Sequence, residues 1–262
     1  MIRKEMSNKS LIEIFNDTKY YSLKYKNYFP IYEKILSNYR EKKITFVEIG
    51  VLSGGSLHMW KEYFGKEARI IGIDLNPDAK RLEHEGFEIF IGNQSDPNFW
   101  DSFFNQVGKV DIILDDGGHT NFQQIITSVS AIPNINDDGV LIVEDVFHSY
   151  GVSYGESGFF NPSKYSFINF CKKIVDDVNC RFPDTKKFKF SLNKYVHSIE
   201  VFESIVAFKI NSELCKQINS VIYNNGQNFN VKDYAHMHDP KIPGSNRFVV
   251  FIKKLYPRFR GT

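Results

Sequence analysis

The sequence predicts an α/β fold in which a mostly parallel sheet carries helices on both faces. Short β-branched apolar runs alternate with helical patterns between residues 44 and 150, which is typical of parallel strands buried on both faces. Several of these runs end in an acidic or glycine-containing turn, as expected where a strand leads into a ligand site or a helix. Two further runs within residues 196–210, interrupted near Glu203-Ser204, predict an antiparallel hairpin that closes the sheet.

The composition fits one large α/β domain with additions. The chain has 262 residues, of which 42% are hydrophobic and 24% are charged. Its net charge of +2 produces no strong positive potential that would attract nucleic acid, so we expect no nucleic-acid partner. The cysteines lack metal-site spacing and fit a reducing cytoplasm. There is no apolar signal core and no run of roughly 20 apolar residues, so we expect a cytoplasmic protein without a transmembrane span.

Residues 1–43 predict a helical extension that precedes the sheet. An apolar stretch is followed by a polar break, and residues 31–36 predict a helix opened by Pro30. The aromatic residues between these stretches suit packing, although hydroxylated aromatic residues could also form a lid over a flat ligand such as adenine. Lys19 and Tyr28 are therefore candidates for ligand contact.

The first strand is expected at residues 44–49 and leads into the loop Gly50-Val51-Leu52-Ser53-Gly54. The glycines permit a tight turn and a close approach to a ligand, although such turns also occur without one. Ser56 is a candidate N-cap for a helix at residues 57–64. The loop lacks the G-x-G-x-x-G spacing that seats a pyrophosphate. Glu48 would repel a pyrophosphate and instead suits a ligand with an ammonium group.

Polar residues also follow the second and third strands. Residues 69–74 predict the second strand, and a carboxylate at Asp74 can accept hydrogen bonds from both ribose hydroxyls or can start a turn. The third strand is expected at residues 87–92, and Asn93 and Gln94 after it could contact the edge of an adenine. The alternative is that this polar segment serves only to begin the next helix.

Two acidic pairs end two neighbouring strands of the predicted sheet, namely Asp115-Asp116 and Glu144-Asp145. Because the carboxyl ends of parallel strands meet at one edge, these acids and His119 should lie close together. Side chains alternate along a strand, so only one of Asp115 and Asp116 should face the pocket squarely. Carboxylates are preferred ligands of Mg²⁺, so the sequence predicts a metal or catalytic site, with helix capping as the alternative.

The chain after Tyr150 predicts a loop, which either moves over the active edge or is an ordinary surface loop, and then a helix at residues 164–178. His236-Met237-His238-Asp239 lacks a third spaced partner for a metal and is interpreted as a loop, with substrate contact as the alternative. The basic tail at residues 246–262 could form an amphipathic surface helix. The patterns divide the chain into an N-terminal helical extension (1–43), a cofactor-binding and catalytic domain (44–210) and a C-terminal extension (211–262).

Together these motifs resemble one family of enzymes, the metal-dependent sugar O-methyltransferases that use S-adenosylmethionine. The resemblance rests on the motifs EIGVLSGGS, GIDLN, IGNQSDP, ILDDGGH and LIVEDVFHSY, which occur in the expected order within residues 44–150. The family includes the macrocin and mycinamicin methyltransferases and relatives in bacterial capsule clusters. The resemblance implies a Rossmann-like class I methyltransferase fold with a seven-stranded sheet and an antiparallel last strand.

The resemblance also implies a binding site for S-adenosylmethionine, formed by Glu48, Gly50, Ser53, Gly54, Asp74, Asn93, Gln94 and Asp115. Within this set, the glycine loop would lie along the methionine part and Asp74 would hold the ribose. Asn93 and Gln94 would lie near the adenine. Relatives often have Gly-Asp-Gln where this chain has Gly92-Asn93-Gln94, and this departure concerns the contact made by Asn93.

The resemblance further implies that Asp116, Glu144 and Asp145 bind Mg²⁺ and that His119 is the general base, so that Asp116 and His119 form the catalytic pair. A sugar hydroxyl is hardly ionised at neutral pH. A metal ion that stabilises the developing alkoxide and an imidazole that removes the proton supply what methyl transfer to such a hydroxyl needs.

For the acceptor, the capsule relatives imply a nucleotide-activated sugar, specifically a GDP-linked heptose used in capsular polysaccharide biosynthesis. One alternative is the sugar of another glycosylated small molecule, such as a macrolide. Another is a non-catalytic cofactor-binding protein on the same fold, against which the retained acids and His119 argue. An NAD-dependent oxidoreductase is disfavoured because the G-x-G-x-x-G motif is missing. The sequence is compatible with a homo-oligomer.

Overall fold

The computed structural model describes residues 9–151, 163–179, 181, 191–217, 222 and 224–227. The chain divides into two compact units, Met1–Ile218 and Asn219–Thr262, and the helices and strands described below belong to the first. Most of the loop expected after Tyr150, the cluster at residues 236–239 and the basic tail lie outside the described residues. No described helix is long and apolar enough to cross a membrane.

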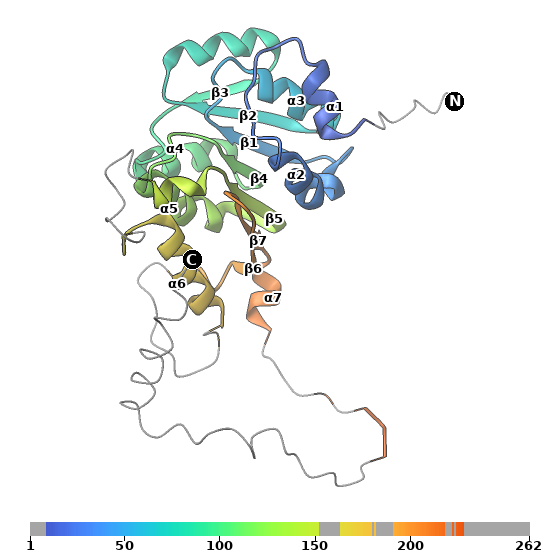
Figure 1. Cartoon of the computed structure of the whole chain (residues 1–262), viewed down its shortest axis with the longest axis vertical. Coiled ribbons are helices and arrows are strands. Elements are labelled where there is room, and N and C mark those ends of the chain that lie inside the picture. The colour runs from blue at the N-terminus through green and yellow to red at the C-terminus, as the bar shows by residue number, and fades with distance from the viewer. Residues whose placement is uncertain are drawn as a thin grey trace, which may run out of the picture. The chain divides into compact units, whose positions relative to one another are not determined.

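Seven strands form one sheet in the order β3-β2-β1-β4-β5-β7-β6 (Figure 1). They are β1 (Thr45–Ile49), β2 (Arg69–Asp74), β3 (Glu88–Ile91), β4 (Val110–Asp115), β5 (Ile135–Val143), β6 (Val196–Val201) and β7 (Val206–Ile210). The first five strands pair in parallel, whereas β7 runs antiparallel to both β5 and β6. The expected parallel sheet with an antiparallel closing hairpin is therefore confirmed.

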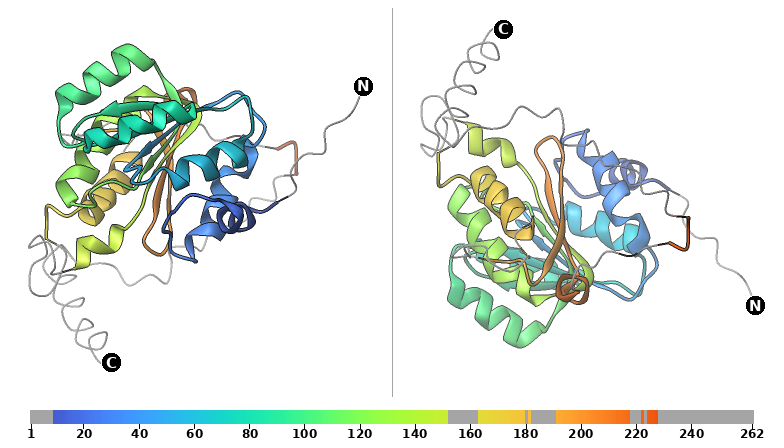
Figure 2. Two further views of the ribbon diagram at one scale, coloured as in Figure 1. Left: turned by 90° about the horizontal axis from the view of Figure 1, so that it is seen from above. Right: turned by 90° about the horizontal axis from the view of Figure 1, so that it is seen from below.

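Helices cover both faces of the sheet (Figure 2). One face carries α1 (Leu11–Asp17), α2 (Tyr28–Leu36) and α3 (Gly55–Phe64), and the other carries α4 (Pro97–Val107), α5 (Asn121–Ala131) and α6 (Phe167–Asn179). The remaining described helices are the 3-10 segments η1 (Ser37–Tyr39), η2 (Pro77–Glu85), η3 (Ile132–Asn134) and η4 (Val146–Tyr150), and α7 (Ser212–Lys216). The helices of the expected N-terminal extension thus belong to the hydrophobic core on the α3 face, where α1 packs against α2 and α3.

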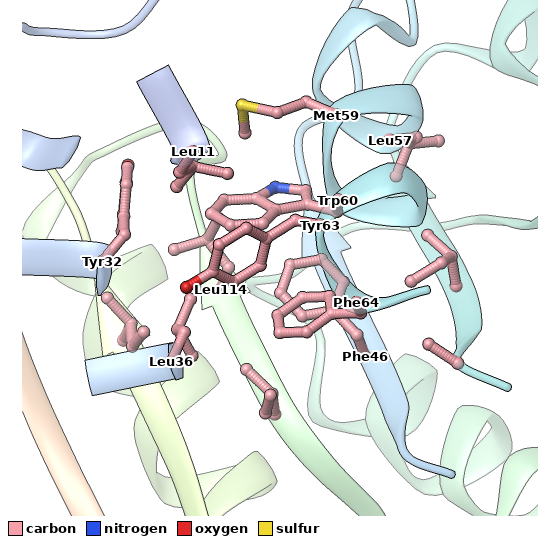
Figure 3. Packing of buried hydrophobic residues seen from close by; sticks show 14 of the residues in the cluster. Leu11, Tyr32, Leu36, Phe46, Leu57, Met59, Trp60, Tyr63, Phe64 and Leu114 are labelled. Atoms are coloured by element: carbon pink, nitrogen blue, oxygen red, sulfur yellow. The ribbon is translucent and has the colours of Figure 1, made fainter. Parts of the chain in front are cut away.

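Aromatic side chains build the core on the α1–α3 face (Figure 3). Trp60 and Phe64 of α3 stack with ring centroids 5.7 Å apart and contact Phe46 of β1, and all three side chains are fully buried. Tyr32 of α2 meets Trp60 edge to face at 5.3 Å. Burial of such large side chains supplies much of the stability of a domain, and the contact of Tyr32 with Trp60 holds α2 against α3. The packing interpretation therefore holds for the aromatic residues of α2.

Two helix starts differ from the sequence expectation. The helix expected from residue 57 begins at Gly55, and Gly54 is its N-cap with a left-handed φ of +87°. Ser56, the expected cap, lies inside the first turn and donates its hydroxyl to the buried Glu48. The helix expected at residues 31–36 begins at Tyr28, so that Pro30 lies in its first turn, where proline is tolerated.

Candidate active site

A cavity opens at the edge of the sheet where the parallel strands end. Its volume is about 930 Å³, and its wall contains residues from the loops after β1 to β5 and from the N-terminal segment. Ligands of open α/β sheets bind at this edge. Most of the residues expected at the site line the cavity: Gly50, Ser53, Asp74, Asn93, Gln94, Asp116, His119, Glu144 and Asp145. The others, Glu48, Gly54 and Asp115, are buried.

The loop after β1 needs glycine because it touches the loop after β4. Gly50 has a φ of +84°, a left-handed conformation that glycine adopts without steric cost. A Cβ atom here would lie 2.2 Å from the backbone oxygen of Asp116, so a larger residue would push the two loops apart. Gly50 therefore sets the distance between the expected cofactor loop and the expected metal loop.

Asp74 at the end of β2 organises the same loop. One carboxylate oxygen accepts hydrogen bonds from the backbone amides of Val51, at 2.9 Å, and Leu52, at 3.3 Å. The other oxygen accepts from the amide of Asn76 at 2.8 Å. Each carboxylate oxygen can accept more than one hydrogen bond, so Asp74 can hold this loop and still receive a ribose hydroxyl from the cavity.

Gln94 is almost fully buried, although it lines the cavity. Its amide nitrogen donates to Asp115 at 2.9 Å and to Thr127 at 3.1 Å, and its oxygen accepts from the amide of Gly118 at 2.9 Å. Asp115 is also buried, and burial raises the pKa of its carboxyl group. Gln94 thus fixes the loop that carries Asp116 and His119. Contact of Gln94 and Asp115 with a cofactor stays a prediction.

Asp116, His119 and Asp145 lie close together in the wall of the cavity. Nε2 of His119 lies 3.4 Å from the carboxylate of Asp145 and 3.9 Å from that of Asp116. One potential ligand atom from each residue lies within 4.8 Å of those from the other two, which is compatible with a shared metal ion. His119 and Asp145 both have left-handed backbone conformations, with φ of 58° and 54°. Such strain in residues other than glycine is concentrated at functional sites.

Helix capping does not account for these acids. The N-cap of α5 is Thr120, whose hydroxyl accepts a hydrogen bond from the amide of Gln123 at 3.2 Å. Asp145 stands at the N-cap of η4, but its side chain makes no capping hydrogen bond. Its carboxylate instead accepts a hydrogen bond from the hydroxyl of Tyr28 at 2.5 Å. Tyr28, a candidate for ligand contact, therefore orients an acid of the site.

Glu144 turns away from His119 and toward the N-terminal segment. Its carboxylate accepts hydrogen bonds from the Tyr32 hydroxyl and from the Lys24 ammonium group, the latter at 3.0 and 3.1 Å. Its side chain is 1% exposed, and burial together with the nearby charge of Asp116 raises its pKa. The three expected metal ligands thus lie around one region, but Glu144 is engaged by Lys24.

Lys24 is the residue of the site that sequence reasoning missed. Its Nζ lies 2.6 Å from Asp116, 3.0 Å from Glu144 and 3.8 Å from Glu48, although only 2% of its side chain is exposed. Burial acts to lower the pKa of Lys24, but the carboxylates outweigh this effect and the pKa is raised. Lys24 belongs to an irregular segment between α1 and α2, where no periodicity marks the position of a side chain.

Glu48 was expected to face a ligand with an ammonium group. Its carboxylate accepts hydrogen bonds from Ser56 at 2.7 Å and from the indole of Trp60 at 3.2 Å, and it is fully buried. Burial is the main cause that raises its pKa to about 7. In this structure, the ammonium group beside Glu48 is that of Lys24.

Aromatic rings border the side of the cavity that carries Asp116, His119 and Asp145. The imidazole of His148 lies parallel to that of His119, with centroids 5.5 Å apart, and burial lowers the pKa of His148. Tyr25 lines the cavity and packs edge to face against Phe147 at 6.1 Å. Both Tyr25 and Phe147 are exposed, so this side of the cavity presents apolar surface.

Curated relatives match a little over half of the chain, whereas no protein-family model matches it. An 8-demethyl-8-α-L-rhamnosyl tetracenomycin-C 2′-O-methyltransferase from Streptomyces olivaceus is 30% identical over 159 residues, covering 58% of this chain and 41% of the relative. The demethylmacrocin O-methyltransferase of Streptomyces fradiae is 29% identical over 157 residues, covering 57% and 39%. The mycinamicin VI 2″-O-methyltransferase of Micromonospora griseorubida is 26% identical over 156 residues, covering 57% and 39%. The matched region therefore spans less than half the length of these relatives.

Solved structures agree with the fold over more of the chain. The MycE methyltransferase of the mycinamycin pathway, in complex with Mg and SAH, superposes with a TM-score of 0.67 over 79% of this chain and 55% of that chain. The sequence identity is 22%. A second structure of MycE that also contains mycinamycin VI gives the same TM-score over 79% and 54%. The chain therefore has the class I, Rossmann-like methyltransferase fold, with a seven-stranded sheet whose last strand is antiparallel.

Proposed function

We propose that this protein is a Mg²⁺-dependent O-methyltransferase that transfers the methyl group of S-adenosylmethionine to a sugar hydroxyl. The observation that carries the proposal is the convergence of Asp116, His119 and Asp145 beside a cavity that Gly50 and Asp74 also line. The names of the matched relatives, which are O-methyltransferases of glycosylated natural products, support the same class of reaction.

The cavity fits S-adenosylmethionine in both chemistry and size. Its volume of about 930 Å³ lies within the range of small-molecule sites. The loop from Gly50 to Gly54 approaches it closely, and Asp74 can accept hydrogen bonds from the ribose. The exposed Leu75 follows Asp74 in sequence, and the exposed Leu52 donates its backbone amide to the Asp74 carboxylate. Both leucines line the cavity, where they would cover the apolar faces of the nucleoside. The MycE complexes with SAH support this assignment.

The acidic residues fit a divalent cation that prefers oxygen ligands. Asp116 and Asp145 would hold Mg²⁺, and Glu144, which shares Lys24 with Asp116, would join them once Lys24 is displaced. When bound, Mg²⁺ would supply electrostatic stabilisation of the oxygen from which the proton is lost. Tyr28 fixes the rotamer of Asp145 by its hydrogen bond, and Gln94 fixes the loop of Asp116.

His119 would remove the proton from the acceptor hydroxyl. Its Nε2 faces the same region as the carboxylates of Asp116 and Asp145, so an acceptor oxygen held there lies within reach of the imidazole. Methyl transfer needs the acceptor oxygen in line with the sulfonium methyl group. The cofactor wall of the cavity and the acidic wall would hold the two reactants in that arrangement.

The acceptor that we propose is a sugar hydroxyl. The sugar is carried either by a glycosylated small molecule or by a nucleotide. The matched relatives act, by their names, on rhamnosyl tetracenomycin-C, demethylmacrocin and mycinamicin VI. These names lend no support to the GDP-linked heptose expected from the capsule resemblance. The exposed aromatic rings of Tyr25 and Phe147 favour an acceptor with an apolar portion.

A mass-detected methyl-transfer screen tests the proposed function. The protein is incubated with S-adenosylmethionine and Mg²⁺ and is offered glycosylated macrolides in one arm and nucleotide-activated heptoses in the other. We expect one added methyl group on a sugar and formation of S-adenosylhomocysteine in one arm. If the folded protein binds S-adenosylmethionine but methylates no sugar in either arm, the proposed acceptor class is wrong.

Asp74→Asn should weaken the binding of S-adenosylmethionine roughly tenfold or more, because a hydrogen bond to a charged group contributes about 1.5–3 kcal/mol. Asparagine keeps one acceptor for the amides of Val51 and Leu52 but loses the acceptor for the amide of Asn76. Isothermal titration calorimetry measures the affinity, and circular dichroism checks the fold. Asp101→Asn, at an exposed position of α4, is the matched control and should bind normally. Unchanged affinity in Asp74→Asn would remove the ribose assignment.

A further inference from the structure

An irregular segment of the chain crosses the mouth of the cavity between α1 and α2. This N-terminal strap consists of residues 18–27, which form no helix or strand. The ring of Tyr20 stacks on His58 of α3 with centroids 3.8 Å apart. Further along, the side-chain amide of Asn27 donates to Glu203 at 3.2 Å. The N-terminal strap is thus attached on both sides of the site, on α3 and on the turn between β6 and β7.

The N-terminal strap also lies against the start of α3 through its backbone. A Cβ atom at Gly55 would lie 2.3 Å from the carbonyl oxygen of Tyr21, so only glycine permits this contact. In contrast, the side chains of Tyr21, Leu23 and Tyr25 are exposed. The side chain in the middle of the strap that enters the protein is that of Lys24.

Lys24 is placed as a bound cation would be. Its ammonium group touches the carboxylates of Asp116 and Glu144 and lies near Glu48, and 2% of the side chain is exposed. A buried ammonium group is costly unless it is fully paired, and the buried acids around it are costly unless a cation neutralises them. Lys24 therefore stabilises a cluster of acids that could not stay charged and buried alone.

The oxygens of Asp116 and Glu144 that bind Lys24 cannot at the same time be ligands of a divalent cation. Asp116 and Glu144 use their oxygens to bind Lys24 at 2.6 to 3.1 Å. Mg²⁺ would require oxygens of these residues at about 2.1 Å in a near-octahedral shell. An ammonium group that remained in place would stand beside the divalent ion without a screening ligand between them, and the like charges would repel strongly at low dielectric.

We propose that Lys24 is a built-in counter-ion of the metal site, which Mg²⁺ displaces when it binds to Asp116 and Glu144. Metal binding and the position of the N-terminal strap are then coupled, since the ammonium group can leave the cluster only if residues near Lys24 move outward. The inference rests on the proposed function, because it takes these acids as metal ligands. It adds that the metal-free enzyme keeps the site neutralised and covered, and that loading the metal opens the strap.

Amine footprinting of the unmodified protein tests the displacement directly. The protein is treated briefly with acetic anhydride in the absence of S-adenosylmethionine, with and without saturating Mg²⁺, and acylation is read by peptide mass spectrometry. We expect Lys24 to be protected without metal and to become at least several-fold more reactive with Mg²⁺. Lys26, two residues away and exposed, is the internal control and should react equally in both samples.

Substitutions test the competition by a second measurement. Lys24→Met removes the competing cation, so the affinity for Mn²⁺ should become about tenfold tighter, within the usual range of coupling between two binding events. Lys24→Arg keeps the charge and should bind Mn²⁺ like the wild type, as should the matched control Lys26→Met. Mn²⁺ binding is followed by electron paramagnetic resonance of the free ion. The footprinting result decides alone if Lys24→Met does not fold.

The outcomes separate this inference from the proposed function. Protection of Lys24 at saturating Mg²⁺, or an equal or weaker affinity for Mn²⁺ in folded Lys24→Met, would show a permanent structural ion pair and overturn the inference. In that case, saturable Mn²⁺ binding by the wild type would still support the proposed metal site. If the wild type binds neither ion, both the metal site and the displacement of Lys24 are wrong.

Discussion

Removing divalent metal should abolish methyl transfer, and adding Mg²⁺ or Mn²⁺ back should restore it. The reason is the charge of the site: Asp116, Glu144 and Asp145 lie around one region, and Lys24 pairs with Asp116 and Glu144 but not with Asp145 among the ion pairs of the described residues. Without a divalent ion, the acceptor oxygen would meet carboxylates that repel it as its negative charge develops. Activity is measured after treatment with excess chelator and after titration with each ion.

Substitutions locate the metal within the cluster. Asp116→Asn and Asp145→Asn each remove one charged ligand and should weaken Mn²⁺ binding by at least the roughly 10–100-fold that loss of an outer-shell partner costs. Asp101→Asn on α4 again serves as the matched control, since it removes an exposed carboxylate outside the site. Full activity in excess chelator, or normal Mn²⁺ affinity in both variants, would leave the acids without a metal.

The sequence predicted the parallel part of the sheet well, because a short apolar run marks each of its strands. The run expected at residues 69–74 coincides with β2, since β-branched residues there end in an acid. The strand expected to end at Glu144-Asp145 begins at Ile135, and Asn136, Asp137 and Asp138 interrupt the apolar pattern near its start. Those residues lie in an irregular part of the strand, between its pairs with β4 at Ile135 and Val140, and Asp137 and Asp138 are exposed.

The site was predicted only as far as strand geometry determines it. Parallel strand ends meet at one edge, so the meeting of Asp116, His119 and Asp145 followed from the topology. Alternation along β4 also explains why Asp116 lines the cavity while Asp115 is buried. Lys24 could not be found in this way. It reaches the acids through an irregular segment, and its partners lie 92 and 120 residues away in sequence.

Replacing His119 should lower turnover by roughly 10²–10⁴-fold, the usual contribution of a general base. The backbone at His119 is left-handed, with φ of 58°, so alanine would add strain to the loss of the imidazole. Asparagine tolerates this conformation better than most residues, which makes His119→Asn the cleaner variant. Single-turnover methyl transfer at saturating S-adenosylmethionine measures the chemical step.

The same variant distinguishes a base from a metal ligand. Nε2 of His119 lies 3.4 Å from Asp145, close enough for the imidazole to be a ligand instead. Mg²⁺ prefers oxygen over imidazole nitrogen, so His119→Asn should bind Mn²⁺ and S-adenosylmethionine nearly as the wild type does. A large loss of Mn²⁺ affinity together with activity would assign His119 to the metal.

His148 is the rival base, because its ring lies parallel to that of His119 with centroids 5.5 Å apart. Burial and the neighbouring His119 lower the pKa of His148, which favours the neutral imidazole that a base requires. However, His119 is the imidazole that lies with Asp116 and Asp145 in the group of potential metal ligands. His148→Ala should therefore reduce turnover far less than His119→Asn, and the exposed His84→Ala should not reduce it. If His148→Ala loses turnover while His119→Asn keeps it, the proton is removed from the η4 side of the cavity and the assignment of His119 is wrong.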